Sequence, residues 1–121
     1  MYKFGKRSKE RLETLHPDLQ KVMNEAIKIY DFSITCGYRD EETQNNEFGE
    51  GDSTKKWPDS KHNSLPSTAV DVCPYPVDWE DVEEFFYLAG IIMSVAHCLE
   101  IKLKWGGRWT HPKDCPHFQL V

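Results

Sequence analysis

Three residues of types that bind metal ions lie near the ends of expected β-strands: His62, Asp71 and His117. Asp71 lies inside the short apolar run 69–73, and His62 precedes that run. A carboxylate among apolar side chains needs a partner, because burying a bare charge costs a large amount of free energy. Two imidazoles and one carboxylate can form a catalytic zinc site, in which three protein ligands leave one position open for water.

Asp114, which precedes His117 by three residues, offers a second carboxylate near the expected ligands. A catalytic zinc ion polarises a carbonyl group and lowers the pKa of a bound water from about 15.7 to about 7. A carboxylate close by can take the proton of that water and pass it to a leaving amine. The four residues together are therefore typical of a metal-dependent hydrolase that acts on amide bonds.

Spacing alone leaves other interpretations open. His62 and Asp71 are too far apart to share one helix face, so the ligands must converge through the fold. The same residues could be a buried carboxylate paired with a structural histidine. A closed structural zinc site is a further alternative, in which Cys73 and Cys115 supply ligands and the second carboxylate is idle.

The elements that must position these residues follow from hydrophobic periodicity and from the positions of Gly and Pro. We expect a short helix from Ser8, helices over 17–30, 40–48 and 78–98, and strands over 32–36, 69–73, 101–105 and 117–121. Residues 1–7 are expected to be a loose start, and 49–61 an exposed loop. This order predicts a single α+β domain over 1–121, with helices on one face of a small antiparallel sheet.

Composition excludes several classes of protein. The 121 residues carry a formal net charge of -5 and no basic run, which argues against nucleic-acid binding. No apolar run approaches the ~20 residues of a membrane span, so we expect no membrane insertion. The first residues lack the apolar stretch of a secretory signal, which predicts a cytosolic start with the four cysteines as free thiols.

Four ordered segments resemble motifs of the zinc D-Ala-D-Ala carboxypeptidase / L-alanyl-D-glutamate endopeptidase family, which has the Hedgehog/DD-peptidase fold. Residues 60–72 resemble its Ser-x-His…Ala-x-Asp motif, and 114–120 resemble its second metal motif. Residues 35–39 with Gln44 resemble its Gly-Tyr-Arg…Gln segment, and 105–109 its Trp-Gly-Gly turn. The resemblance covers roughly residues 8–121, and phage endolysins are the members most similar in length and layout.

The resemblance implies roles for individual residues. One Zn²⁺ ion would be bound by His62, Asp71 and His117, and Asp114 would serve as general base and then as general acid. Arg39 would hold the substrate carbonyl or the oxyanion, because a guanidinium is always charged and offers a planar fork of donors.

Smaller roles have simple alternatives. Arg39 could instead form a surface salt bridge with Asp40 or Glu41. Ser60 would contact the substrate or support the neighbouring histidine, and His111 is expected to be a solvated loop residue. Four aromatic residues are expected either to line a cleft for a sugar–peptide polymer or to pack in the core: Trp57, Tyr75, Trp105 and Trp109.

The function implied is that of a zinc endolysin that cleaves the L-alanyl-D-glutamate bond of peptidoglycan stem peptides. A D-Ala-D-Ala carboxypeptidase or dipeptidase is the alternative, and it would need a second cation to close one end of the cleft. The sequence offers no assured second cation, which favours the endopeptidase. We expect a monomer with peptidoglycan as its partner, made in the host bacterial cytoplasm and released to the wall by a holin.

Overall fold

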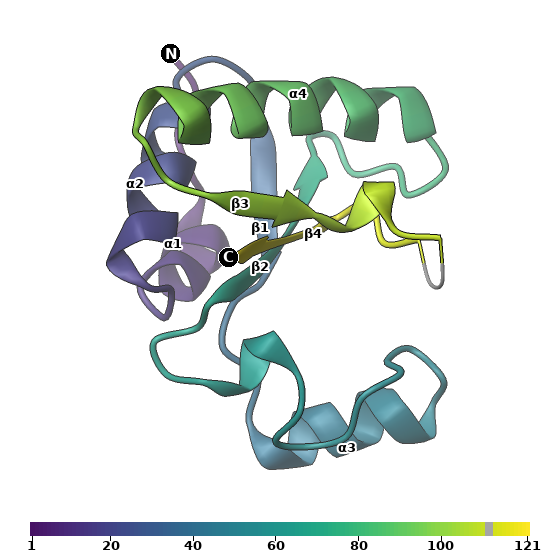
Figure 1. Cartoon of the computed structure of the whole chain (residues 1–121). Helices are drawn as coiled ribbons and strands as arrows, with labels where there is room; N and C mark the ends of the chain where they lie inside the picture. Colours follow the sequence, from purple (N-terminus) through teal and green to yellow (C-terminus); the bar gives the residue numbers. More distant parts are fainter. Residues whose placement is uncertain (111–112) are drawn as a thin grey trace.

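The computed structural model describes residues 1–110 and 113–121, which form the expected α+β fold (Figure 1). The helices are α1 (Lys6–Leu12), α2 (Pro17–Ala26), α3 (Glu41–Gly49) and α4 (Val82–Cys98), with 3₁₀ turns η1 (Lys61–Asn63) and η2 (Gly106–Arg108). The strands are β1 (Phe32–Cys36), β2 (Ala69–Pro74), β3 (Leu103–Trp105) and β4 (His117–Leu120). His111, expected to be a solvated loop residue, lies outside the described residues.

The four strands form one antiparallel sheet in the order β1-β2-β4-β3. The two strands that contain Asp71 and His117, β2 and β4, are therefore adjacent at the centre of the sheet. Because antiparallel pairing places residues of the two strands directly opposite one another, a single register fixes which side chains meet.

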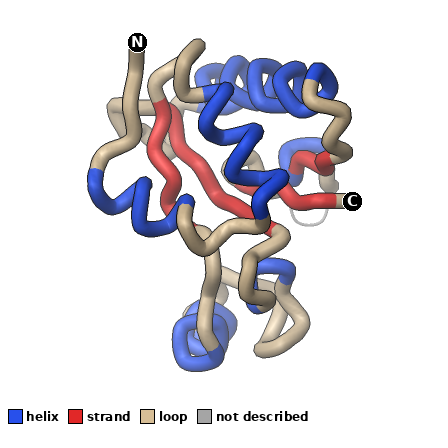
Figure 2. Tube along the Cα trace, turned by 90° about the vertical axis from the view of Figure 1, so that its left-hand side faces the viewer, coloured by secondary structure: helices blue, strands red, loops and turns tan. Residues whose placement is uncertain are grey.

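The core lies between this sheet and the helices α2 and α4, which contact each other. The apolar stripe of α2 is buried as its helical spacing predicts, with Leu19, Val22, Met23 and Ala26 fully inaccessible. Figures 1 and 2 show α3 separated from these helices, at the far end of the molecule from α4. The connections around α3 therefore lie outside the main core.

The N-terminus differs from the loose start expected for residues 1–7. Helix α1 already begins at Lys6, and Phe4 is only 7% exposed. Its ring packs edge-on against Phe32, with the centroids 5.2 Å apart. The Phe4 side chain thus packs the N-terminal segment against the core. The charged residues on either side of Phe4 gave the segment the composition of an exposed start.

Helix α4 begins at Val82, later than the expected start at residue 78. Asp81 caps it, and the carboxylate of Asp78 accepts a hydrogen bond from the backbone N–H of Glu80. Val82 and Phe86, although apolar, are 49% and 46% exposed. They fall outside a narrower buried stripe that consists of Phe85, Leu88, Ala89, Ile92 and Ala96. No helix among the described residues is both long and apolar enough to span a bilayer.

Candidate metal centre

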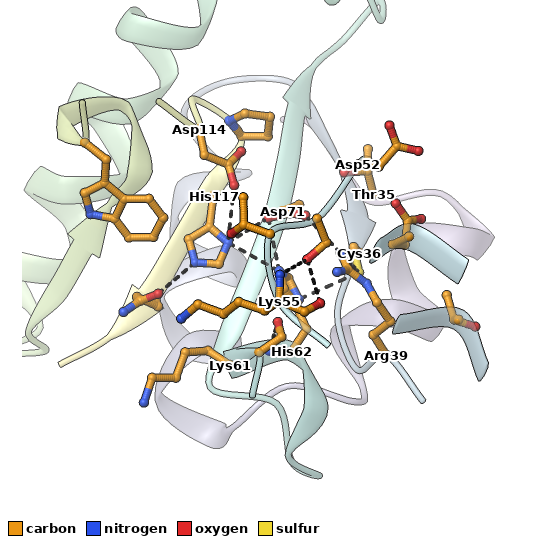
Figure 3. Close-up of a pocket in the computed structure, with 18 of the residues that line it drawn as sticks. Thr35, Cys36, Arg39, Asp52, Lys55, Lys61, His62, Asp71, Asp114 and His117 are labelled. Atoms are coloured by element: carbon orange, nitrogen blue, oxygen red, sulfur yellow. Dashed lines mark hydrogen bonds and ion pairs between the residues drawn. The ribbon is translucent and has the colours of Figure 1, made fainter. Parts of the chain in front are cut away.

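The register of β2 with β4 brings Asp71 directly opposite His117. His62 reaches the same point from η1, the turn that precedes β2 (Figure 3). The capping box of η1 holds its backbone, because the Ser60 side chain accepts from the backbone of the turn and the Asn63 side chain accepts from the N–H of Ser60. The three expected ligands, far apart in sequence, are therefore adjacent in space.

Three ligand atoms form a nearly equilateral triangle. Nε2 of His62 lies 3.2 Å from Oδ1 of Asp71 and 3.3 Å from Nδ1 of His117, and that Nδ1 lies 3.1 Å from Oδ1. Four ligands at the ~2.0–2.1 Å distances of a tetrahedral zinc ion stand about 3.3 Å from one another. The triangle has the size of one face of such a tetrahedron, so the donor set fits a zinc ion.

Both imidazoles are oriented by acceptors on their outer nitrogens. Nδ1 of His62 lies 2.8 Å from the carbonyl oxygen of Gly37, and Nε2 of His117 lies 2.9 Å from the side-chain oxygen of Gln119. An amide oxygen only accepts, so each of these ring nitrogens carries the proton. The other nitrogen of each ring is left with a lone pair directed at the triangle, as in metal-binding histidines.

The charges around the triangle favour a proton or a cation at its centre. Burial disfavours charge on His62, but the carboxylate of Asp71 outweighs burial and raises the pKa of His62 to about 10. Burial likewise opposes ionisation of Asp71, but the two imidazoles lower the pKa of its carboxyl group well below the ordinary value. Two lone pairs and a carboxylate in contact are stable only with a proton or a metal ion between them.

Asp114 stands beside this triangle without being part of it. Its Oδ2 lies 4.0 Å from Nδ1 of His117, and its side chain is 41% exposed. Burial and the negative charge of Asp71 raise the pKa of its carboxyl group. The backbone of Gly106 holds the residue in position, because its carbonyl accepts the N–H of Asp114 at 2.9 Å. A carboxylate at this place can exchange protons with a molecule bound at the triangle.

The guanidinium of Arg39 points to the same centre. It lies 3.7 Å from Oδ2 of Asp71, donates to the side-chain oxygen of Gln44 at 3.0 Å and reaches the thiol of Cys36 at 3.4 Å. The salt bridge that Arg39 forms among the described residues is to Asp71, and neither Asp40 nor Glu41 pairs with it. Asp40 caps α3 by accepting from the backbone N–H of Thr43. Arg39 also lines the cleft described below, with donors left for a substrate oxygen.

Gln44 fixes Arg39 from behind. Its amide is fully buried, although it is the only buried residue of the polar helix α3. The amide oxygen accepts from both Arg39 and Asn63, and the amide nitrogen donates to the side chain of Ser53 and to the carbonyl of Lys55. One side chain therefore joins the arginine, the turn that holds His62, and the loop after α3.

The closed site with Cys73 and Cys115 as ligands is not supported. Among the described residues, the groups able to hold a metal ion are Cys36 with His62 and Asp71, and Asp71 with Asp114 and His117. Cys73 is buried and is paired with Ser33 in the sheet, away from the triangle. The thiol near the centre is Cys36, with Sγ 3.7 Å from Nδ1 of His62. The sequence analysis missed it, although it directly precedes the Gly-Tyr-Arg segment.

The site opens into a cleft of about 1200 Å³. Of the four aromatic residues considered for it, only Trp109 lines the cleft, with its ring centroid 5.1 Å from that of His117. Trp105 packs against Phe118 instead, and neither Trp57 nor Tyr75 lines the cleft. Sequence analysis missed the lining residue Trp79 and the part of the 49–61 loop that lies along the cleft, residues 51–55.

Comparisons with known proteins identify the family of this chain. A family model described as phage L-alanyl-D-glutamate peptidase matches residues 1–120. The chain belongs to that family. Within it, the chain is 35% identical over 118 aligned residues to the L-alanyl-D-glutamate peptidase of Escherichia phage T5, covering 93% of this chain and 85% of that protein.

A solved structure of a related peptidase has the same fold as this member of the phage L-alanyl-D-glutamate peptidase family. The L-Ala D-Glu endopeptidase ChiX of Serratia marcescens superposes with a TM-score of 0.83 at 34% sequence identity. The match covers 98% of this chain and 90% of ChiX. The α+β fold, the family and the class of enzyme, a hydrolase of peptide bonds, are therefore established by sequence and by structure together.

Proposed function

We propose that this chain hydrolyses the L-alanyl-D-glutamate bond of peptidoglycan stem peptides with one zinc ion bound by His62, Asp71 and His117. The observation that carries the metal assignment is the triangle of ligand atoms with edges of 3.1, 3.2 and 3.3 Å. A zinc ion held there would polarise a carbonyl group and lower the pKa of a bound water.

The protein's own groups supply the remaining functions. Asp114 takes a proton from the attacking water and returns it to the leaving amine, since its carboxylate stands beside the triangle and is partly exposed to the cleft. Arg39 donates to the carbonyl oxygen as negative charge develops on it. Ser60, whose side chain accepts from the backbone N–H of His62 at 3.2 Å, supports that ligand and lies in the cleft where it can meet the substrate.

A D-Ala-D-Ala carboxypeptidase or dipeptidase is the less favoured function. Such an enzyme recognises the free end of its substrate, whereas the relatives reported above are named for the internal L-alanyl-D-glutamate bond. In the same proposal the enzyme acts as a monomer, accumulates in the host bacterial cytoplasm and reaches the wall once a holin opens the membrane.

Digestion of purified peptidoglycan, with and without a zinc chelator, tests the function. Mass analysis of the fragments should find new carboxyl ends at L-alanine and new amino ends at D-glutamate, and the chelator should abolish both. Added zinc should restore cleavage. Release of free D-alanine instead would support the carboxypeptidase, and cleavage that survives complete zinc removal would refute the metal mechanism.

A further inference from the structure

Two lysines extend into the cleft close to the metal centre. Lys55 and Lys61 both line it, and both are exposed. Figure 3 shows their side chains running in the same direction below His117, toward the end of the site away from Arg39. Within residues 1–110 and 113–121, neither ammonium group forms a salt bridge or lies over an aromatic ring. Two positive charges are therefore available to a ligand.

The backbones of both lysines are bound to the catalytic framework. The carbonyl of Lys55 accepts a hydrogen bond from the fully buried amide of Gln44, the same amide that holds Arg39. Lys61 directly precedes His62 in η1, and its carbonyl accepts from the hydroxyl of Thr68 at 3.3 Å. Both side chains therefore start from backbone that hydrogen bonds hold beside the candidate site, and both ammonium groups stay within reach of the cleft.

The cleft is asymmetric in charge. Glu47 and Asp52 also line it, and Figure 3 shows Asp52 on the side of Arg39, away from the lysine ammonium groups. Carboxylates repel an anionic group of a substrate, and ammonium groups attract it. The two ammonium groups therefore attract a substrate carboxylate to their side of the site, while Arg39 on the other side is already paired with Asp71.

We propose that Lys55 and Lys61 form a subsite for the free carboxylate of the D-glutamyl residue. The inference rests on the proposed function, which places D-glutamate next to the scissile bond. A glutamyl residue within a peptide uses one of its two carboxyl groups in the next amide bond and keeps the other. The two lysines supply a second cation in the cleft, and the proposed function assigns to it the internal carboxylate of D-glutamate rather than a chain end.

The test compares two synthetic peptides. One carries an acylated L-alanyl-D-glutamyl unit followed by a further residue, and the other has a carboxamide in place of the free carboxylate. The zinc-loaded enzyme should cleave the first with about tenfold higher kcat/KM, since a charge-assisted contact exceeds a neutral one. In the double variant Lys55→Gln/Lys61→Gln, kcat/KM should fall for the carboxylate peptide and stay the same for the carboxamide peptide, so that the preference disappears. The zinc content of the variant should be unchanged.

Lys56→Gln is the control, because it removes the same charge from the same loop. Lys56 lies over the ring of Phe48, 5.0 Å from the centroid, and does not line the cleft. This variant should retain the tenfold preference. Equal cleavage of both peptides by the unaltered enzyme, or an equal loss on both in the double variant, would overturn the subsite. Failure to cleave either peptide or peptidoglycan would instead refute the proposed function.

Discussion

The side-chain oxygen of Gln119 lies 2.9 Å from Nε2 of His117, on the opposite side of the ring from Nδ1, which faces His62 and Asp71. Acceptors of this kind fix the tautomer of a ligand and raise its basicity, and their loss typically weakens metal binding 10–100-fold. We predict that Gln119→Leu lowers zinc affinity by about that factor, measured by competition with a chromophoric chelator.

The control for this experiment keeps the acceptor. Gln119→Glu should bind zinc at least as tightly as the unaltered protein, because a carboxylate accepts the same hydrogen bond. If Gln119→Leu and the unaltered protein compete equally with the chelator, the contact has no role in orienting His117.

Replacement of Asp114 separates catalysis from metal binding. Its carboxylate stands 4.0 Å from His117 and outside the triangle of ligand atoms, so Asp114→Asn should retain one zinc ion per chain. Loss of a general base and acid typically costs about 10²–10⁴-fold in rate. Elemental analysis and kcat on a stem-peptide substrate measure the two effects. Near-normal turnover with full zinc content would exclude Asp114 from the reaction.

The sequence predicts how two residues of the candidate metal centre meet, because each of them lies in a segment with the pattern of a strand. The runs 69–73 and 117–121 predict two of the observed strands, and their pairing places Asp71 opposite His117. Residue type and the family resemblance supply the third expected ligand, His62. Antiparallel pairing makes neighbours of Asp71 and His117, and the turn η1 brings His62 to them, which no helix periodicity could do.

The lining of the cleft could not be predicted in the same way. The segment 49–61 has the composition of a solvated loop, and most of its residues are exposed. Its course along the cleft depends on the buried amide of Gln44, which donates to Ser53 and Lys55. Gln44 lies in a helix whose other residues are partly or fully exposed, so periodicity gives no sign that this one is buried. Contacts between a loop and a single buried polar group leave no repeating pattern to detect.

The metal-free protein should lose stability as the pH rises. The pKa of His62 is raised to about 10, so the stabilisation by its protonated form is complete below about pH 6.5 and is lost between there and pH 10. The lowered pKa of Asp71 gives stabilisation above about pH 3.8 that is lost at lower pH. The melting temperature in chelator should therefore fall on both sides of this window, by roughly 4 °C for each kcal/mol.

Zinc should remove the alkaline part of this dependence. A bound metal ion replaces the proton between His62 and Asp71, so deprotonation at high pH no longer leaves the carboxylate unpaired. Melting curves at pH 6 and pH 9, each with zinc and with chelator, provide the measurement. An equal fall in melting temperature between pH 6 and pH 9 with zinc and with chelator would mean that these two residues do not share a cation.

Gly106 tests whether the Trp-Gly-Gly turn positions Asp114. A Cβ atom at Gly106 would stand 2.3 Å from the carbonyl oxygen of Asp114 and 3.0 Å from its Cβ, so Gly106→Ala must displace the aspartate backbone. We expect about 1–3 kcal/mol lower stability, as in other overpacked sites, and a kcat reduced at least tenfold with zinc still bound.

Gly90→Ala is the control, because a Cβ there, within α4, meets nothing within 4 Å. That variant should gain about 0.5–1 kcal/mol from the better helix propensity of Ala and keep full activity. Chemical denaturation and turnover of the two variants side by side distinguish a specific displacement of Asp114 from a general effect of replacing glycine, and full activity in Gly106→Ala would contradict a positioning role for the turn.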